Sequence, residues 1–248
     1  EIIGREYTKA LPRFDIQALR PFEVMFADNK DYDYTQRGGF KTALVIIDLK
    51  TLLKYKVDLT QKRDNGWAIQ QFYVKFGVHK MPYKCTMYSD GCGSMVHLAK
   101  AGIRMGIDHC NLPPHDAALN LAEFAQRQMW EVARTLLARS GAPATLMAKA
   151  VEYAMYVDMR MATTSRIRGE ITPYEAIQGH PPNISHLKPF YTKSYVTVAH
   201  AKRQLLKNRG MGEVRAETGR FLGFTDPFGG TYRILLDGYT SAQGSIKE

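Results

Sequence analysis

The hydrophobic positions in the first quarter of the chain fall into short runs that predict β-strands. The apolar runs over residues 22–28 and 40–49 are dense enough for buried strands, whereas residues 51–59 alternate between apolar and polar as a half-exposed strand does. Turn-forming residues over 32–39 separate the first two runs. Three consecutive strands with short connections predict an antiparallel meander.

The segments after the meander alternate between helical and strand patterns. A helix is predicted over residues 65–76, with Asp64 as its N-cap, and a strand over 83–89. A short helix over 94–101 and a short strand over 106–111 follow. This strand–helix–strand order indicates an α/β layer in which helices pack on the sheet.

The second half of the chain begins with two long helical patterns and ends in short strands. Apolar residues at helical period predict helices over about 116–139 and 143–163. Thr172 is expected to cap a short helix that has Pro173 in its first turn. Short β segments between glycine-rich turns then predict a small β-barrel-like module. The expected division is a basic N-terminal arm (1–21), an α/β core (22–168), a linker (169–185) and a small basic module (186–248).

Composition narrows the class of protein. A hydrophobic fraction of 45% is sufficient for a folded core, and a net charge of +10 indicates a polyanionic partner, of which nucleic acid is the first candidate and plain solubility the alternative. The cysteine count is odd, with 3 residues in no zinc-binding pattern, so we expect an intracellular, reducing compartment. Apolar runs are too short to cross a bilayer, and no membrane partner is expected. The chain starts at Glu1 rather than Met, as expected of a fragment or processed product.

Three carboxylates carry the candidate chemistry. Asp28 and Asp90 each end an apolar run, and Glu123 lies near the start of the first long helix. Two strand ends and one helix can bring these side chains together, and Mg²⁺ or Mn²⁺ prefers charged oxygen ligands of this kind. These positions suit a two-metal phosphoryl-transfer site, in which all three residues would be catalytic and bind metal. The alternative is structural, because carboxylates are common at strand ends and favour helix N-termini.

Basic residues give a candidate nucleic-acid surface. Arg127 and Arg134 share a helix face with Glu123, where they would either follow a phosphate backbone or be solvated. The C-terminal module contains the densest basic stretch, for which contact with nucleic acid is favoured over a plain charged loop. Its residues are Lys188, Lys193, Lys202, Arg203, Lys207 and Arg209.

Several ordered motifs resemble the copia-type (Pseudoviridae) retrotransposon integrases, a branch of the retroviral integrase group. The resemblance implies an RNase H-like α/β fold, a mixed sheet flanked by helices, followed by a small β-rich module. It also implies magnesium-dependent DNA 3′-end processing and strand transfer, a nuclear location and multimers. The stretches that resemble the family are Phe22–Asp28, Phe40–Asp48, Asp90-Gly91, Leu119–Glu123 with Arg134, Thr172–Ala176, Gly179–Phe190 and Gly219–Phe224.

The chain also departs from the family pattern near the candidate site. Asp90-Gly-Cys-Gly-Ser94 replaces the usual Asp-Asn-Gly-x-Glu, Phe124 replaces the Arg that follows the third carboxylate, and no N-terminal zinc-binding segment is found. Such changes are typical of a descendant that keeps the scaffold and no longer cuts DNA. Two functions therefore stay open. One is an active integrase core, and the other is a domesticated, inactive RNA- or DNA-binding component of a larger assembly such as a ribonucleoprotein, with an organelle as its possible location.

Overall fold

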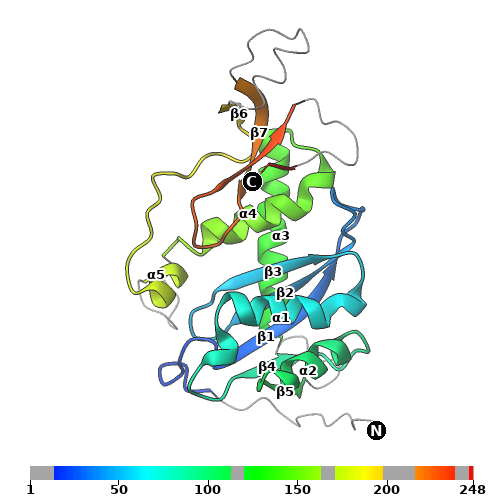
Figure 1. Cartoon of the computed structure of the whole chain (residues 1–248), viewed down its shortest axis with the longest axis vertical. Coiled ribbons are helices and arrows are strands. Elements are labelled where there is room, and N and C mark those ends of the chain that lie inside the picture. The colour runs from blue at the N-terminus through cyan, green and yellow to red at the C-terminus, as the bar shows by residue number, and fades with distance from the viewer. Residues whose placement is uncertain (1–13, 113–119, 163–170, 198–215, 238–245, 248) are drawn as a thin grey trace, which may run out of the picture.

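A computed structural model describes residues 14–112, 120–162, 171–197, 216–237 and 246–247. The first half forms a five-stranded mixed sheet in the order β3-β2-β1-β4-β5 (Figure 1). Strands β1, β2 and β3 pair antiparallel, and β4 and β5 continue the sheet in parallel from β1. The predicted meander and α/β layer are therefore confirmed. The strands are β1 (Val24–Asp31), β2 (Thr42–Asp48), β3 (Lys54–Leu59), β4 (Thr86–Ser89) and β5 (Asp108–Asn111).

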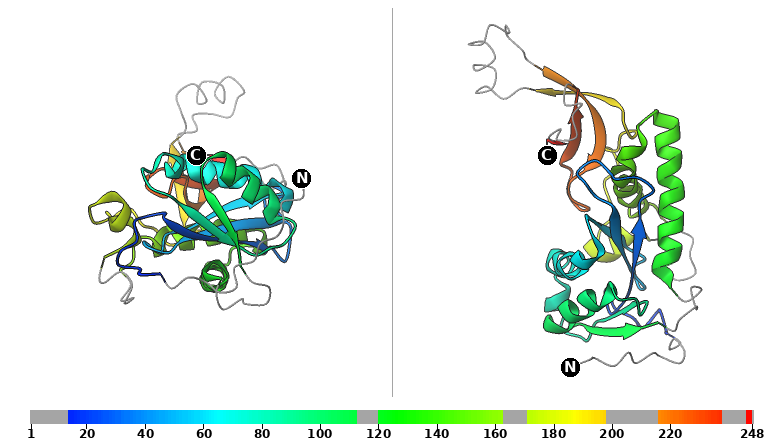
Figure 2. Two further views of the ribbon diagram at one scale, coloured as in Figure 1. Left: turned by 90° about the horizontal axis from the view of Figure 1, so that it is seen from below. Right: turned by 90° about the vertical axis from the view of Figure 1, so that its right-hand side faces the viewer.

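Helices cover both faces of this sheet. Helices α1 (Asn65–Lys75) and α2 (Met95–Arg104) pack on one face, and the long helix α3 (Leu121–Ser140) lies on the other (Figure 2). Successive side chains of a strand point to opposite faces. Met25 accordingly belongs to the cluster under α1 and α2, whereas Phe26 belongs to the cluster beside the start of α3. The mixed sheet flanked by helices is the fold that the sequence predicts.

The starts of α1 and α3 differ in how they are capped. Asp64 occupies the N-cap position of α1, but its side chain makes no capping hydrogen bond, because a 3₁₀ turn over Lys62–Asp64 leads directly into the helix. The helix predicted from about 116 begins at Leu121, and the extended residue Asn120 caps it by accepting a hydrogen bond from the Ala122 amide at 3.1 Å. Residues 116–119 of that prediction lie outside the described residues. Asp64 therefore occupies the predicted N-cap position but does not make the side-chain hydrogen bond expected of it.

The remaining helices and the second sheet form the other end of the molecule. Helix α4 (Met147–Asp158) packs against α3, and the predicted Thr172 cap of α5 (Pro173–Gln178) is confirmed by a 3.0 Å hydrogen bond from the Glu175 amide. A four-stranded antiparallel sheet then follows in the order β6-β7-β8-β9. Its strands are β6 (Lys193–Thr197), β7 (Ala216–Phe224), β8 (Tyr232–Leu236) and β9 (Ile246–Lys247).

The C-terminal sheet shares a hydrophobic core with α3 and α4. Phe224 of β7 stacks on Tyr156 of α4 with ring centroids 4.1 Å apart, and Phe221 meets Tyr153 edge-on at 5.5 Å. Aromatic pairs of this kind add to the hydrophobic energy of burial. The small β-rich module is therefore observed, and it is packed on the core, while the exact domain boundaries stay a prediction.

The described end of the N-terminal arm is packed as well. Phe14 contacts Tyr88 edge-on at 5.9 Å, and Ile16 and Leu19 add to the hydrophobic cluster beside the start of α3. Lys50 donates hydrogen bonds to two carbonyls of this arm. Within the described ranges, no helix has both the length and the apolar character needed to cross a bilayer.

Candidate metal and nucleic-acid site

Asp28 and Asp90 lie side by side because β1 and β4 are adjacent parallel strands. The register of β1 and β4 pairs Ala27 with Ser89, so the two aspartates stand at the next position of each strand. Asp28 alternates in phase with Phe26, and Asp90 with Tyr88, and both of these aromatic residues lie in the cluster on the α3 side. Strand alternation therefore directs both carboxylates to the face that α3 covers.

Helix α3 brings the third carboxylate to that face. Because Asn120 starts the helix, Glu123 stands in its first turn, where it is exposed and where the positive end of the helix dipole favours a negative charge. Gln126 follows almost one turn later and is buried. The beginning of α3 thus faces the middle of β1 and the end of β4. The prediction that Asp28 ends its strand is wrong, because pairing with β2 extends β1 to Asp31.

The pKa of Asp28 reports how close these groups are. Burial is the main cause that raises this pKa to about 6, and the negative charge of Asp90 adds to it, with a smaller contribution from Glu123. The Asn29 backbone amide, which donates to Asp28 Oδ1 at 2.8 Å, and the nearby Gln126 amide act in the opposite direction. The structure therefore brings the three predicted carboxylates into one electrostatic neighbourhood.

The donor chemistry of this neighbourhood fits a hard divalent cation. Asp90 Oδ1 is buried and has no hydrogen-bond partner among the described residues, and a buried polar atom without a partner is energetically unfavourable. A bound cation would satisfy that oxygen and would remove the repulsion that raises the Asp28 pKa. Within the part of the chain that the structure describes, however, no three His, Cys, Asp or Glu side chains stand ready in metal-binding geometry.

A basic pocket adjoins the carboxylates. It has a volume of about 170 Å³, and both predicted arginines, Arg127 and Arg134, line it together with Glu123. Lys30 lines the pocket as well, although the sequence alone favoured an ordinary exposed residue over one that approaches a phosphate. Strand alternation could have identified it, because Lys30 follows Asp28 by two positions and so shares its face. Trp130 also lines the pocket, and its ring stacks on that of Tyr32 with the ring centroids 5.6 Å apart.

The C-terminal basic residues are only partly described. Lys188 and Lys193 are exposed, and the Lys193 ammonium lies 5.5 Å from the centre of the Tyr195 ring. Exposed cations of this kind are free to meet phosphates. The other predicted contacts lie outside the described residues, namely Lys202, Arg203, Lys207 and Arg209.

Comparison with known proteins gives one curated relative, and no protein-family model matches the chain. The chain is 25% identical over 216 residues to the retrovirus-related Pol polyprotein from transposon RE2 of Arabidopsis thaliana. The match covers 84% of this chain but 14% of the polyprotein. The chain therefore corresponds to a small part of that relative.

Solved structures give the fold. A chain of the simian T-cell lymphotropic virus intasome, solved in complex with PP2A regulatory subunit B56 gamma, superposes with a TM-score of 0.53 at 12% identity and covers 96% of this chain and 80% of that one. The HTLV-2 integrase catalytic core domain, solved with magnesium in a trimeric form, has a TM-score of 0.47 at 13% identity over 64% of this chain and 98% of that one. The resemblance that the motifs indicated is confirmed: the chain is similar to a copia-type retrotransposon polyprotein and shares the fold of the intasome chain, the RNase H-like α/β fold that the motifs implied.

Proposed function

We propose that this chain is an integrase-type catalytic core that binds Mg²⁺ or Mn²⁺ through Asp28, Asp90 and Glu123 and transfers phosphoryl groups of DNA. The observation that carries the proposal is the parallel register of β1 and β4, which sets Asp28 beside Asp90 on the face where Glu123 stands in the first turn of α3. The reactions would be 3′-end processing and strand transfer. The similarity to a transposon polyprotein supports the same chemistry.

The residues of the site would divide the work of binding and positioning. When bound, a pair of divalent cations polarises the scissile phosphate and lowers the pKa of the attacking water or hydroxyl. Asp28 and Asp90 would hold the cations, with Glu123 closing the site. The basic side chains of the adjacent pocket, Lys30, Arg127 and Arg134, would bind the phosphates next to the scissile one. They would thereby align the DNA for in-line attack.

A metal titration and a strand-transfer assay test the proposal together. Wild-type protein should bind Mn²⁺ and should join a labelled DNA end to a target duplex, and Asp90→Asn should lose both properties. Asp33→Asn is the matched control, because it makes the same chemical change at an exposed turn position. Loss of activity in the control as well, or full activity in Asp90→Asn, would contradict the assigned site.

The basic pocket has a separate test. Each phosphate contact contributes to the salt dependence of DNA binding, so Arg127→Ala and Arg134→Ala should each reduce the slope of log affinity against log salt by about 1. Arg104→Ala is the control, because Arg104 is exposed at the end of α2, on the opposite side of the sheet. Equal slopes for all four proteins would exclude the pocket as a phosphate site.

A second candidate function is a domesticated, inactive scaffold that binds RNA or DNA within a larger assembly. It is favoured by the loop Asp90–Ser94, whose two glycines allow the backbone wide freedom, and by the lack of a ready metal cage among the described side chains. Shape-based binding needs phosphate contacts and no catalysis. Strong salt-sensitive binding of nucleic acid without Mn²⁺ binding would favour this function. Multimer formation and the location in nucleus or organelle belong to these proposals.

A further inference from the structure

A pair of asparagine side chains, Asn29 and the buried Asn65, connects the Asp28 strand to the helix layer. Asn65 Nδ2 donates to Asn29 Oδ1 at 2.8 Å, and Asn29 Nδ2 donates to Asn65 Oδ1 at 3.0 Å. Asn65 is the first residue of α1 and is 0% exposed. Each side-chain amide donates one hydrogen bond to the other and accepts one from it. The two bonds together fix the orientation of both amide planes, because neither amide can rotate without breaking them.

The same pair also holds the far end of the Asp90 loop. Asn65 Nδ2 donates to the Ser94 carbonyl at 3.2 Å, and the Ser94 hydroxyl donates to Asn29 Oδ1 at 3.4 Å. Ser94 stands at the N-cap position of α2, where the loop from Asp90 ends. The near end of that loop is fixed by the β4 ladder. Gly91 and Gly93 give the loop little stiffness of its own, so these two attachments determine where it lies.

Asn29 reaches the first candidate ligand through its backbone. Its amide donates to Asp28 Oδ1 at 2.8 Å and thereby opposes the rise in the pKa of that carboxyl. Its side chain, on the other face of the strand, belongs to the pair with Asn65. One residue therefore contacts the Asp28 carboxylate on one side and the support of the Asp90 loop on the other.

We propose that Asn29, Asn65 and Ser94 are positioning residues that set the separation of the Asp28 and Asp90 carboxylates and thereby the affinity for divalent cations. The inference rests on the proposed metal site. Asn29 donates to the Asp28 carboxylate, and Asn65 and Ser94 hold Asn29 and the end of the Asp90 loop, which are the places that the outer partners of metal sites occupy. Loss of such partners typically weakens metal binding by about 10- to 100-fold.

Calorimetric titration of Mn²⁺ into protein without DNA tests this inference. Asn65→Ala and Asn29→Ala should each weaken Mn²⁺ binding by about 10-fold or more, and the double variant should be little worse than either one, because the pair acts as a unit. Ser94→Ala removes one hydroxyl and keeps the asparagine pair, so it should show a smaller loss even if Asn65→Ala unfolds. Asn183→Ala is the control, because it removes a 2.9 Å hydrogen bond to the Ser185 amide in a distant loop.

The outcomes separate this inference from the proposed function. If wild-type protein binds Mn²⁺ and the folded variants bind it equally well, with only a lower free energy of unfolding, the asparagine pair is structural and the inference is overturned alone. If wild-type protein binds no Mn²⁺, both proposals are overturned. If the variants lose Mn²⁺ affinity while wild-type protein binds Mn²⁺ without joining DNA, the positioning role holds and the proposed reaction is wrong.

Discussion

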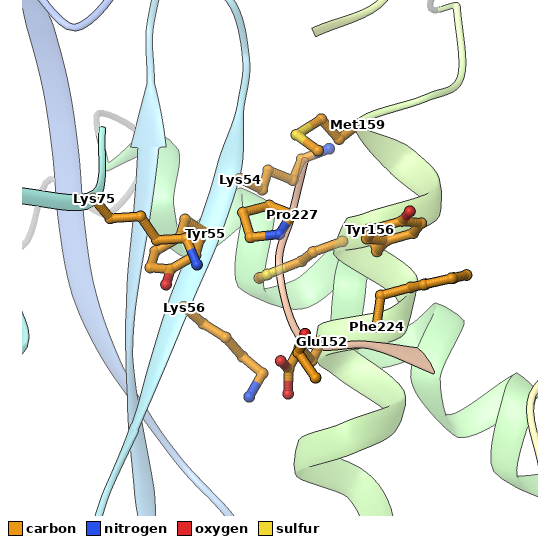
Figure 3. A pocket seen from close by; sticks show the side chains of 11 residues that line it. Lys54, Tyr55, Lys56, Lys75, Glu152, Tyr156, Met159, Phe224 and Pro227 are labelled. Atoms are coloured by element: carbon orange, nitrogen blue, oxygen red, sulfur yellow. The ribbon is translucent and has the colours of Figure 1, made fainter. Parts of the chain in front are cut away.

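Glu152 of α4 should be one of the main charged contributors to stability, and Glu152→Gln removes its charge while keeping its shape. The carboxylate lies 2.7 Å from Arg233 Nη1 of β8 and 3.0 Å from Lys149 Nζ of α4. Lys56 of β3 points toward it from the core sheet (Figure 3). Only 2% of the Lys56 side chain and 8% of the Arg233 side chain are exposed, so Glu152 balances cations that water hardly reaches.

The size of the stabilising contribution of Glu152 follows from the pKa of its carboxyl group. Burial alone would raise the pKa of Glu152, but the charges of Lys149, Lys56 and Arg233 outweigh it and lower this pKa from 4.5 to about 2. Each tenfold change in a protonation constant is worth about 1.4 kcal/mol, so the cations favour the charged form by about 3 kcal/mol. Because 31% of the side chain remains exposed, solvent screening reduces the expected contribution to about 2 kcal/mol.

The sign of the pH dependence distinguishes this effect from a loss of packing. A carboxyl with a lowered folded-state pKa stabilises the protein above pH 4.5, and this contribution is lost as the pH falls toward 2. Urea unfolding followed by tryptophan fluorescence should therefore show Glu152→Gln less stable than wild type by about 2 kcal/mol at pH 7. The difference in the free energy of unfolding between Glu152→Gln and wild type should become smaller between pH 5 and pH 3.

The matched control is Glu131→Gln, an exposed position on α3. It should leave the free energy of unfolding within about 0.5 kcal/mol of wild type at every pH. Equal stability of Glu152→Gln and wild type at pH 7 would refute the electrostatic reasoning. A difference that stays constant as the pH falls would assign the effect to packing instead.

Three further changes test other parts of the structure. Asp90→Asn removes a negative charge that raises the pKa of Asp28, so the Asp28 carboxyl should titrate at a lower pH when followed by carbon NMR. An unchanged titration would show that the two carboxyls do not interact. Gly219→Ala would place a Cβ 2.5 Å from the Leu235 carbonyl oxygen, so we expect the free energy of unfolding to fall by about 1–3 kcal/mol, with Gly93→Ala, which meets nothing within 4 Å, as the harmless comparison. Phe224→Ala should reduce the free energy of unfolding by about 3–5 kcal/mol and expose the C-terminal sheet to protease, and slow cleavage equal to wild type would show that the sheet does not depend on this ring.

Local pattern was sufficient for the elements and for part of the site. The almost continuous apolar run before Leu49 predicted the fully buried strand β2, because a central strand must be apolar on both faces. The ends of the apolar runs located both aspartates, and Asp90 does follow the last residue of β4, whereas β1 continues past Asp28 to Asp31 because its pairing with β2 extends that far. A resemblance of ordered motifs, rather than any periodicity, joined Glu123 to them.

The roles of other residues of the site could not be predicted from their neighbours in the sequence. Asn65 looked like part of a helix start, and its role depends on Asn29 and Ser94, which are 36 and 29 positions away. Asp64 has the right residue type for an N-cap, but the chain enters α1 through a 3₁₀ turn and its side chain caps nothing. Side-chain hydrogen bonds between distant segments depend on packing, and the choice of partner is not encoded in neighbouring residues.

The sequence by itself determined where most strands and helices lie, which apolar runs end in an acid, and that the net charge favours a polyanionic partner. Periodicity and turn residues are properties of neighbouring residues, and net charge follows from composition alone. The tertiary structure alone decided that parallel pairing of β1 and β4 sets Asp28 beside Asp90 and that Lys30 joins the arginine pocket. It also decided that Lys56 is buried among paired charges under the C-terminal sheet. Burial and electrostatic coupling arise only when distant segments exclude water together, and that is why no single segment could predict them.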